Sequence, residues 1–586
     1  MVSDKLQNMI SRVHQALERD IQPLNGQTPP FILFFSFTDT KSRAQTLSAT
    51  AENFNDCWNV GLKKLRQAID TSKLEVKWLR VDWVESVEDI DKPELTKRLQ
   101  QIKRNYFRYG IALDAQFQTA FLETELNGNA MLYGGPSVPT AILNEANFNR
   151  YATRSRGLAK IPVNEIERFH VFSTKALFTT DDDESIHLIP GSGPNTGRRA
   201  IEMMDIADID GLIERGSRFL ESQMGDDGRF IYGWHPCFDS QIRTYNTLRH
   251  TSTLYAMLES WEVTRDDALK DAIERGLVHL TTRLIKTIDQ DGRELAFLTE
   301  ENGEIKLGGN AVCLLALVKY SELTGTDRYL ALLEKLALGI LHMQDQETGK
   351  FNHVLNYPSL SVKEPFRIIY YDGEAAFGLM RLYSLTRDAR WLDAVEKAFH
   401  HFMEADHWKA HDHWLSYAVN ELTRYRPEQK YYQFGIRNFA DYLDFVSSRI
   451  TTFPTLLELM MAAQQMIKRI EADPKLAPLL ADVDLRKFYF ALERRAHHLL
   501  NGHFWPELAM FYANPARING SFFIRHHAFR VRIDDVEHYL SGFVAYRKYR
   551  LGMQSAESLG HVSQKWEPSS RGNQFAGLIS DPAAMG

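Results

Sequence analysis

The sequence predicts an α/β N-terminal domain followed by a mainly α (α/α)6 toroid, a closed ring of six helical hairpins. Three observations predict this fold class. Segments with strand-like patterns gather in the first 200 of the 586 residues. Beyond them the chain repeats itself about every 60 residues, which is typical of helical repeat units. Finally, amphipathic helices alternate with more apolar ones in six pairs, as expected of an outer and an inner layer.

Two apolar segments near the N-terminus are rich in the β-branched and aromatic residues that favour strands. They are FILFFSF (31–37) and VKWLRVDWV (76–84). The segment between them has the apolar spacing of a helix, over 50–69. Further along, the patterns predict a helix over 93–106, a strand over 109–114, a helix over 115–126 and a hairpin over 167–190.

The segment GSGPNTGRR (191–199) breaks both periodicities, and its Gly, Ser and Pro content indicates a linker. A phosphate-binding loop is the alternative, but the segment lacks the Lys-Ser/Thr ending of such loops. We therefore expect a mixed α/β domain over 1–190, a linker over 191–203, the toroid over 204–555 and a loosely ordered tail over 556–586. The first domain should have its own core, formed by residues including Phe34, Trp58, Leu62, Leu79 and Val81.

Three similar stretches indicate the internal repeat: WEVTRDDALKDA, SELTGTDRYLAL and YSLTRDARWLDA. Their threonines, Thr264, Thr324 and Thr386, are 60 and 62 residues apart, and Thr423 anchors a weaker copy. Glycine turns recur in the connections, in GDDGRF (225–230), DQDGRE (289–294) and QETGKF (346–351). Such turns are typical of tight hairpins.

The helices after residue 200 fall into two kinds. Six are charged and amphipathic, over 208–223, 266–287, 326–344, 387–404, 431–447 and 485–500. Their six partners are more apolar, over 251–262, 310–323, 374–385, 413–422, 454–469 and 535–550. Units of this kind bury their apolar faces on their neighbours, so the apolar helices should line the middle of a ring.

Composition and charge exclude several classes of protein. A net charge of -7 and a pI near 6.3 give no bulk reason to expect nucleic-acid binding, which needs a concentrated basic face. No run of about 18 apolar residues predicts a membrane span. The three cysteines, Cys57, Cys237 and Cys313, are too far apart for a metal motif and suit a reducing compartment. We expect a cytoplasmic protein without a cofactor.

Ionisable residues concentrate where the apolar helices begin, and in a ring these junctions converge on one end. The groups are Arg249 and His250; Tyr371, Asp372 and Glu374; His411, Asp412 and His413; and Arg532, Asp534, Asp535 and His538. Carboxylates, imidazoles, guanidinium groups and aromatic rings around one site suit a glycan ligand. Aromatic faces stack on sugar rings, and carboxylates or imidazoles transfer protons.

These residues define the candidate site. The candidate catalytic residues are Asp372, Glu374, Asp534, Asp535 and His538. The candidate substrate-binding residues are Arg249, His250, Asn310, Tyr371, His413, Trp414 and Arg532. Helix capping by Asp and the preference for Glu in a first helical turn are structural alternatives. The histidines in DHWKAHDHW (406–414) lack a carboxylate–histidine motif, so we expect no metal.

Residues 200–555 resemble the (α/α)6-toroid group of carbohydrate-active proteins. The stretch YNTLRHTSTLYAML, with the DGRF turn before it, is similar to the toroids of glucuronyl epimerases and unsaturated-glucuronyl hydrolases. This resemblance implies epimerisation, hydrolysis or elimination at sugars, often acidic ones. It covers about 60% of the chain and is architectural, because fold alone does not define function.

We therefore expect a saccharide- or glycan-active enzyme, a hydrolase, epimerase or lyase with acid/base chemistry at the toroid mouth. The expected ligand is a saccharide or glycan, neutral or acidic. The alternative is a non-catalytic toroid that binds a glycan or protein partner, with the N-terminal domain as an adaptor. A hydrolase needs two carboxyl groups roughly 5 to 10 Å apart. We also expect Arg249 and His250 to share a cavity with Tyr371, Asp372, Asp535 and His538, and an arginine to pair with one of the aspartates.

Overall fold

The N-terminal part of the protein is built on a seven-stranded sheet in which all strand pairs are antiparallel. The computed structural model describes residues 4–26, 29–193 and 195–558. The sheet order is β2-β1-β3-β6-β4-β5, with β7 paired to β6. The strands are β1 (Phe31–Thr38), β2 (Gln45–Ala51), β3 (Trp78–Asp91), β4 (Gly110–Ala112), β5 (Ala120–Phe121), β6 (Arg168–Thr180) and β7 (His187–Ile189).

The two faces of this sheet have different neighbours because side chains alternate along a strand. On β1, Leu33 and Phe35 belong to a core with the helices α1 and α2, which also contains Trp58. Ile32 and Phe34 belong instead to the core that is continuous with the toroid. Phe34 therefore does not join the separate core expected from the sequence. The helices of this part are α1 (Asp4–Asp20), α2 (Phe54–Ser72), α3 (Lys92–Gln101), α4 (Glu123–Gly128) and α5 (Glu145–Ser155).

The predicted helix over 115–126 is wrong for most of its length. Asp114 accepts hydrogen bonds from the backbone N–H groups of Gln116, Gln118 and Thr119. This turn, held by an aspartate side chain, offers the backbone an alternative to helix. The chain then forms β5, and α4 begins only at Glu123.

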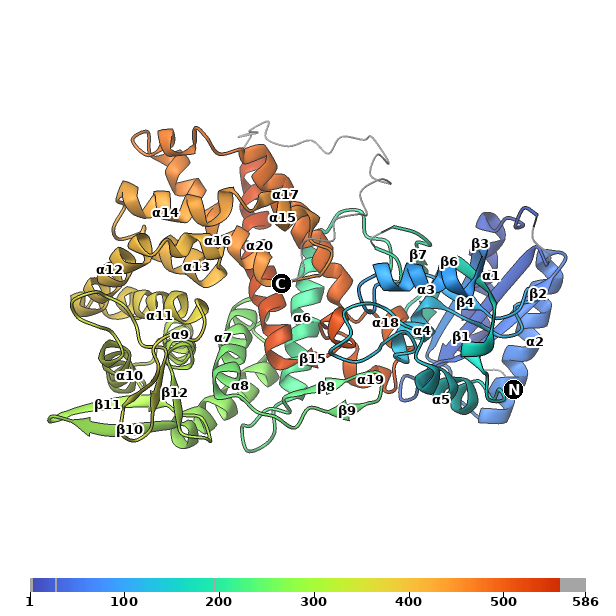
Figure 1. Ribbon diagram of the computed structural model, residues 1–586, viewed down its shortest axis with the longest axis horizontal. Coiled ribbons are helices and arrows are strands. Elements are labelled where there is room, and N and C mark those ends of the chain that lie inside the picture. Colours follow the sequence, from blue (N-terminus) through green and yellow to red (C-terminus); the bar gives the residue numbers. More distant parts are fainter. Residues whose placement is uncertain (1–3, 27–28, 194, 559–586) are drawn as a thin grey trace.

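Six helices form a closed inner ring (Figure 1). Each packs against the next in chain order, and the last, α20, returns to pack against the first, α7. The described part of the chain therefore contains a ring, as predicted, with starts close to those expected. The inner helices are α7 (Thr247–Thr264), α9 (Leu307–Thr324), α11 (Tyr370–Thr386), α13 (His413–Leu422), α16 (Thr455–Ala472) and α20 (Ile533–Ser558).

A second layer of helices surrounds the ring, each packed on the inner helix beside it. These outer helices bury one face only, whereas an inner helix such as α9 is buried along nearly all of its length. No helix among the described residues has the length and apolar character to cross a bilayer. The outer helices are α6 (Ile206–Ser222), α8 (Asp267–His279), α10 (Leu330–His342), α12 (Ala389–Glu404), α14 (Gln429–Ala440) and α17 (Leu485–His498), with the short α15 (Leu443–Ser448) before α17.

The repeated threonines end the inner helices. Thr264, Thr324 and Thr386 are the last residues of α7, α9 and α11. In each case the next residue has left-handed backbone conformation, as Gly325 does at φ 71°. The hydroxyls of Thr324 and Thr386 donate to carbonyl oxygens one turn earlier. The repeat in the sequence is therefore a repeated helix stop.

Short hairpins join the helices at the predicted glycine turns. The largest pairs β10 (Ile285–Gln290) with β11 (Arg293–Leu298) through Asp291 and Gly292, both at positive φ, as two-residue hairpin turns require. The other two turns bring Met224 opposite Phe230 and Gln344 opposite Phe351. The remaining short strands are β8 (Gly233–His235), β9 (Ser240–Gln241), β12 (Glu304–Lys306), β13 (Val354–Asn356), β14 (Val362–Glu364) and β15 (Val531–Arg532).

A long connection between α17 and α20, residues 499–532, carries the short helices α18 (Pro506–Ala509) and α19 (Pro515–Ile518). We call it the bridging segment, because it lies between the ring and the N-terminal sheet (Figure 1). Arg80 of β3 donates a hydrogen bond of 2.9 Å to the carbonyl oxygen of Glu507. The backbone N–H of Ala44 donates to Met510. These bonds attach the sheet to the toroid.

The expected linker, 191–203, is irregular in structure but packed against the protein. Arg198 is buried, and Arg199 forms a bidentate ion pair with Glu507 of the bridging segment. The division into two domains at this point stays a prediction. Helix α20 reaches Ser558, and the rest of the expected tail, from 559, lies outside the described residues.

Close approach of the inner helices makes Gly373 intolerant of a side chain. A Cβ added to this residue of α11 would lie 2.6 Å from the backbone nitrogen of Leu415 on α13. We predict that Gly373→Ala lowers the free energy of unfolding by about 1–3 kcal/mol, the usual cost of overpacking. Urea denaturation measures this loss.

Gly552→Ala is the matched control for Gly373→Ala, because this α20 residue is exposed with no atom within 4 Å of an added Cβ. The control should be neutral, or stabilising by up to about 1 kcal/mol through helix propensity. Equal behaviour of the two variants would contradict close packing between α11 and α13.

Candidate functional site

All six inner helices begin at the same end of the ring, which we call the mouth. Contacts between residues near the helix starts show this arrangement. Ser252 of α7 donates to Glu537 of α20, and Glu458 of α16 contacts His538 of α20. The equivalent starts of α9, α11 and α13 also adjoin one another, because Gly308 faces Glu374 and Gly373 faces Leu415. The ionisable groups predicted at the junctions are therefore gathered at one end.

A chain of alternating charges lies across the mouth between α7 and the start of α20. The Nε of Arg249 lies 2.8 Å from Oδ2 of Asp534, which also accepts a hydrogen bond of 2.8 Å from Arg532. Arg532 also donates a hydrogen bond of 3.4 Å to Asp535. Arg530 pairs with the same aspartate through two bonds of 3.0 Å. The predicted arginine–aspartate pairing is therefore present, and it uses Arg249 and Arg532 within the protein.

One turn deeper, His538 lies among carboxylates. Its Nδ1 is 2.9 Å from Oε2 of Glu458 and 3.8 Å from Oε1 of Glu537. The other oxygen of Glu458 accepts a hydrogen bond of 3.2 Å from the hydroxyl of Tyr417. Glu537 accepts a hydrogen bond of 2.5 Å from the hydroxyl of Ser252. The carboxylates thus fix the ring of His538 in one orientation.

His413 faces His538 across the ring, with the two imidazole centres 5.4 Å apart at a steep angle. The Nδ1 of His413 lies 3.1 Å from Oδ1 of Asp412, a buried oxygen that makes no hydrogen bond. The other oxygen of Asp412, Oδ2, caps α13 by accepting from the backbone N–H of Leu415. The Nε2 of His413 is buried and has no hydrogen-bond partner within the protein. Trp414 packs beside it, with ring centres 5.1 Å apart.

Glu374, on α11, is the last member of this group of ionisable residues. Its Oε2 is buried without a hydrogen-bond partner. Burial, together with the nearby carboxylates of Asp412 and Glu537, raises the pKa of Glu374 well above its ordinary value. Burial in this setting favours the protonated form of the carboxyl group over the ionised form. Buried polar atoms without partners are rare in proteins, so these orphaned atoms of Glu374 and His413 indicate a place for a ligand.

Charges within the group move other pKa values as well. Burial acts to lower the pKa of His538, but the carboxylates of Glu537 and Glu458 outweigh it and raise that pKa to about 10. Burial raises the pKa of Glu537 to about 8 against the opposing effect of His538. Burial and Asp535 raise the pKa of Asp534. These shifts favour a protonated imidazole at His538 beside carboxyl groups that hold their protons more tightly than in water.

Asp372 does not join this group. Its Oδ2 lies 3.2 Å from Nε2 of His353, in the connection before α11. Asp372 and Glu374 are two residues apart on one helix, and such residues do not share a face. Because Glu374 points into the ring, Asp372 points away from it. The expectation that Asp372 shares a cavity with Arg249 is wrong.

His250 also points away from the mouth. Its Nδ1 pairs with the hydroxyl of Tyr245 at 2.8 Å, and its Nε2 lies 3.3 Å from the carbonyl oxygen of Gly276 on the outer helix α8. Burial lowers its pKa to about 3, so the ring is neutral. The expectation that His250 points into a shared cavity is wrong, because both ring nitrogens are turned toward Tyr245 and the outer helix α8.

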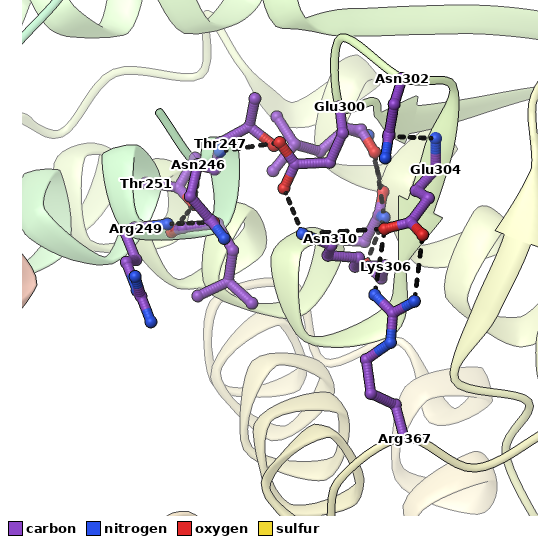
Figure 2. Close-up of polar contacts among 12 residues, drawn as sticks. Asn246, Thr247, Arg249, Thr251, Glu300, Asn302, Glu304, Lys306, Asn310 and Arg367 are labelled. Carbon is purple, nitrogen blue, oxygen red and sulfur yellow. Dashed lines mark hydrogen bonds and ion pairs between the residues drawn. The ribbon is translucent and has the colours of Figure 1, made fainter. Parts of the chain in front are cut away.

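Asn310 lies in a separate polar network that ties together the starts of α7 and α9 (Figure 2). Its amide accepts from the N–H of Leu298 and donates to the carbonyl oxygen of Lys306. In the same network Glu300 accepts from the N–H of Thr247 and from Lys306. All bonds of Asn310 go to the backbone. Arg249 turns away from this network (Figure 2), which leaves it free to meet Asp534.

Glu304 extends this network toward α11, through two bonds of 3.0 Å from Arg367 (Figure 2). Tyr371 is buried between the network and the site. Its ring lies against Gly308, and burial with the charge of Glu374 raises its pKa to about 12. Trp414 is also buried, against Phe377 and Tyr417.

One group of described side chains has the spacing to hold a metal ion. A ligand atom from each of His413, Glu458 and His538 lies within 4.8 Å of the others. Two imidazoles and a carboxylate are a common donor set for divalent metals. In the structure the Nδ1 of His538 lies 2.9 Å from Oε2 of Glu458. The absence of a metal expected from the sequence stays a prediction.

Two central residues, Glu458 and Glu537, were not among the predicted site residues. Each had a signal in the sequence. Glu458 is the single carboxylate in the apolar stretch TLLELMMAA of an inner helix, and Glu537 lies between two predicted site residues. A lone charge on a buried face is rarely left without a partner. An isolated carboxylate on an apolar inner helix is the sequence signal that marks both residues.

No family model matches the chain, and no curated relative does. Solved structures similar to it include a D-mannose isomerase, with 12% sequence identity, a TM-score of 0.45 and coverage of 59% of this chain and 99% of that chain. A GH76 α-mannanase from Bacteroides thetaiotaomicron has 10% identity, a TM-score of 0.43 and coverage of 59% and 97%. For a cellobiose 2-epimerase from Bacillus thermoamylovorans the values are 11%, 0.45, 59% and 99%. These structure neighbours are (α/α)6-toroid carbohydrate-active proteins.

The raised pKa of Glu537 predicts a pH-dependent effect of Glu537→Gln. A carboxyl group with a raised folded-state pKa stabilises the fold when protonated, and that stability is lost as pH rises from 4.5 through 8. Glutamine keeps the acceptor for Ser252 and does not titrate. The melting temperature of the variant should therefore match that of the wild type near pH 5 and exceed it at pH 8.5.

Thermal melts at both pH values measure this effect. Glu301→Gln, at an exposed glutamate paired with Arg229, is the control and should show no such pH-dependent gain. A Glu537→Gln variant that is equally destabilised at both pH values would contradict the protonated state of Glu537.

Proposed function

We propose that the protein is a saccharide-active enzyme that moves a proton on a sugar, an epimerase or isomerase, with its acid/base site at the mouth of the toroid. One observation carries the proposal. Two imidazoles, His413 and His538, face each other 5.4 Å apart, and each has a carboxylate at its Nδ1. A carboxylate at one ring nitrogen orients the imidazole and leaves the other nitrogen for proton transfer.

The two imidazoles would have different tasks. His538, whose pKa is about 10, carries a proton and acts as the acid. His413, with an unpartnered Nε2, acts as the base. Epimerisation needs a base that takes the proton from the carbon next to a carbonyl group and an acid that stabilises the resulting oxygen charge. Return of the proton to the opposite face inverts the carbon, and return to the neighbouring carbon moves the carbonyl group.

The charges at the mouth favour a neutral saccharide over an acidic one. Arg249 and Arg532 are both paired with Asp534, and Arg530 is paired with Asp535. A ligand carboxylate would have to displace a protein carboxylate from these pairs. Breaking such a partly buried pair costs several kcal/mol. The arginines therefore serve better to fix the carboxylates than to hold an acidic sugar.

Hydrolysis is the second candidate, and Glu374 supports it. A buried carboxyl group with a raised pKa and an unpartnered oxygen has the properties of a general acid. A partner carboxylate for a glycosidase would come from Asp534, which pairs with Arg249 and Arg532. A toroid that binds a glycan without turnover would use the same orphaned polar atoms.

We also propose a cytoplasmic location and two domains, the first ending before residue 191. All three cysteines are buried and free, as in proteins of reducing compartments. The seven-stranded sheet with its own helical core supports a distinct N-terminal unit.

Deuterium exchange tests the proposed function. Incubation with neutral aldoses and reducing disaccharides in D2O, followed by NMR, should show deuterium at the carbon next to the carbonyl group. His413→Asn and His538→Asn should each lower the exchange rate at least about 100-fold, the usual contribution of a general acid or base. His400→Asn, at an exposed histidine of α12, should have no effect.

The same samples separate the alternatives. Release of new reducing ends without exchange would indicate a hydrolase, and Glu374→Gln should then abolish it. Saturable saccharide binding with neither reaction would indicate a binding toroid. Unchanged exchange in folded His413→Asn would overturn the assignment of the base.

A further inference from the structure

Three described side chains at the mouth have the spacing of a metal site. His413 of α13, Glu458 of α16 and His538 of α20 come from consecutive inner helices, and one ligand atom of each lies within 4.8 Å of the others. Ligand atoms about 2.1 Å from one zinc ion lie about 3.4 Å apart in a tetrahedral site. The longest of the three separations must therefore shorten by at most about 1.4 Å, which small rotations of the side chains supply.

His413 presents a free ligand atom. The residue is 4% exposed, and its buried Nε2 has no hydrogen-bond partner among the described residues. Its other ring nitrogen, Nδ1, lies 3.1 Å from Oδ1 of Asp412. A carboxylate beside one ring nitrogen favours the tautomer with the proton on that nitrogen, as is common for histidines that bind metals. This tautomer leaves the lone pair of Nε2 for a cation.

Glu458 is held from one side and faces a possible ligand on the other. Its Oε1 accepts a hydrogen bond of 3.2 Å from the hydroxyl of Tyr417, and carboxylates that bind metals commonly have such an outer partner. Its Oε2 lies 2.9 Å from Nδ1 of His538. A metal ion between these two atoms replaces the hydrogen of that bond, and the proton leaves to the solvent.

The surroundings favour a small cation of double charge. In addition to Glu458, Asp412 lies 3.1 Å from His413, and Glu537 lies 3.8 Å from His538. Two imidazoles and one carboxylate suit zinc better than magnesium or calcium, which prefer oxygen ligands. The side chain of His538 is 24% exposed, so an ion can reach these ligands from the mouth.

We propose that His413, Glu458 and His538 bind one zinc ion and that zinc inhibits the enzyme. The bound ion occupies Nε2 of His413 and displaces the proton of His538, so it removes both the base and the acid of the proposed reaction. Only the inhibition rests on the proposed function. The expectation of no metal concerned the neighbouring histidines of 406–414, whereas 80 residues separate Glu458 from His538. Zinc in this role is an inhibitor and not a cofactor.

Thermal melts of the full chain, freed of metal by a chelator, test the binding. A ligand that binds only the folded state raises the melting temperature with the logarithm of its concentration. We expect this rise with zinc chloride and not with magnesium chloride. Crystals soaked in zinc should show an anomalous peak between His413 and His538. No rise in melting temperature, or a peak only at surface histidines, would overturn the site.

Variants locate the bound ion, with the zinc dissociation constant measured by titration calorimetry. Tyr417→Phe removes the outer hydrogen bond of Glu458 and should raise this constant about 10- to 100-fold. Glu458→Gln removes the charged ligand and should raise it further. His400→Asn, at an exposed histidine of α12, should bind zinc as the wild type does. If Glu458→Gln does not fold, Tyr417→Phe decides, and an unchanged constant in that variant would overturn the site.

The deuterium-exchange assay with neutral reducing sugars tests the inhibition. Zinc should lower the exchange rate with a half-maximal concentration close to its dissociation constant, and a chelator should restore the rate. Zinc that binds at the site and leaves the exchange rate unchanged would overturn the inhibition. If the metal-free protein exchanges no saccharide hydrogen, the proposed function fails, while the melts and the anomalous peak still decide the zinc site.

Discussion

The return of α20 to α7 is the contact on which the rest of the structure depends. Inner helices such as α9 are buried on nearly every side and have no face suited to water, so the row of helices must close into a ring. Arg249 with Asp534, and Ser252 with Glu537, join the two ends of that row. Because those pairs also form the mouth, the same contact that closes the ring assembles the candidate site.

Crowding of carboxyl groups at the mouth follows from this closure. Six helix starts meet there, and helix starts favour acidic residues because of their unpaired N–H groups. Glu374 and Glu537 are then too close to other carboxylates, and too deeply buried, to ionise as they would in water. His538 also holds its proton more tightly than in water, so its ring carries a charge. The site thus obtains proton donors at neutral pH from the geometry of the ring.

Local patterns predicted the ring well, because each threonine stop and glycine turn depends on a few neighbouring residues. The direction in which each side chain points was harder to predict. Asp372 and His250 are at the mouth in sequence, yet they face outward to His353 and Gly276. For Asp372 the sequence did contain this information, because it lies two residues before Glu374 on one helix and residues with that spacing do not share a face. The pairing of Glu458 with His538 did not follow from any local pattern, because 80 residues separate them.

The bridging segment packs against both the N-terminal sheet and the ring. Ile32 on one side and Phe523 on the other belong to a single apolar core. A chain shortened to the ring alone would expose part of that core to water. Such exposed apolar patches favour aggregation. The two halves of this protein are therefore better regarded as partners in folding than as interchangeable modules, and any exchange of the first half must bring an equivalent covering surface.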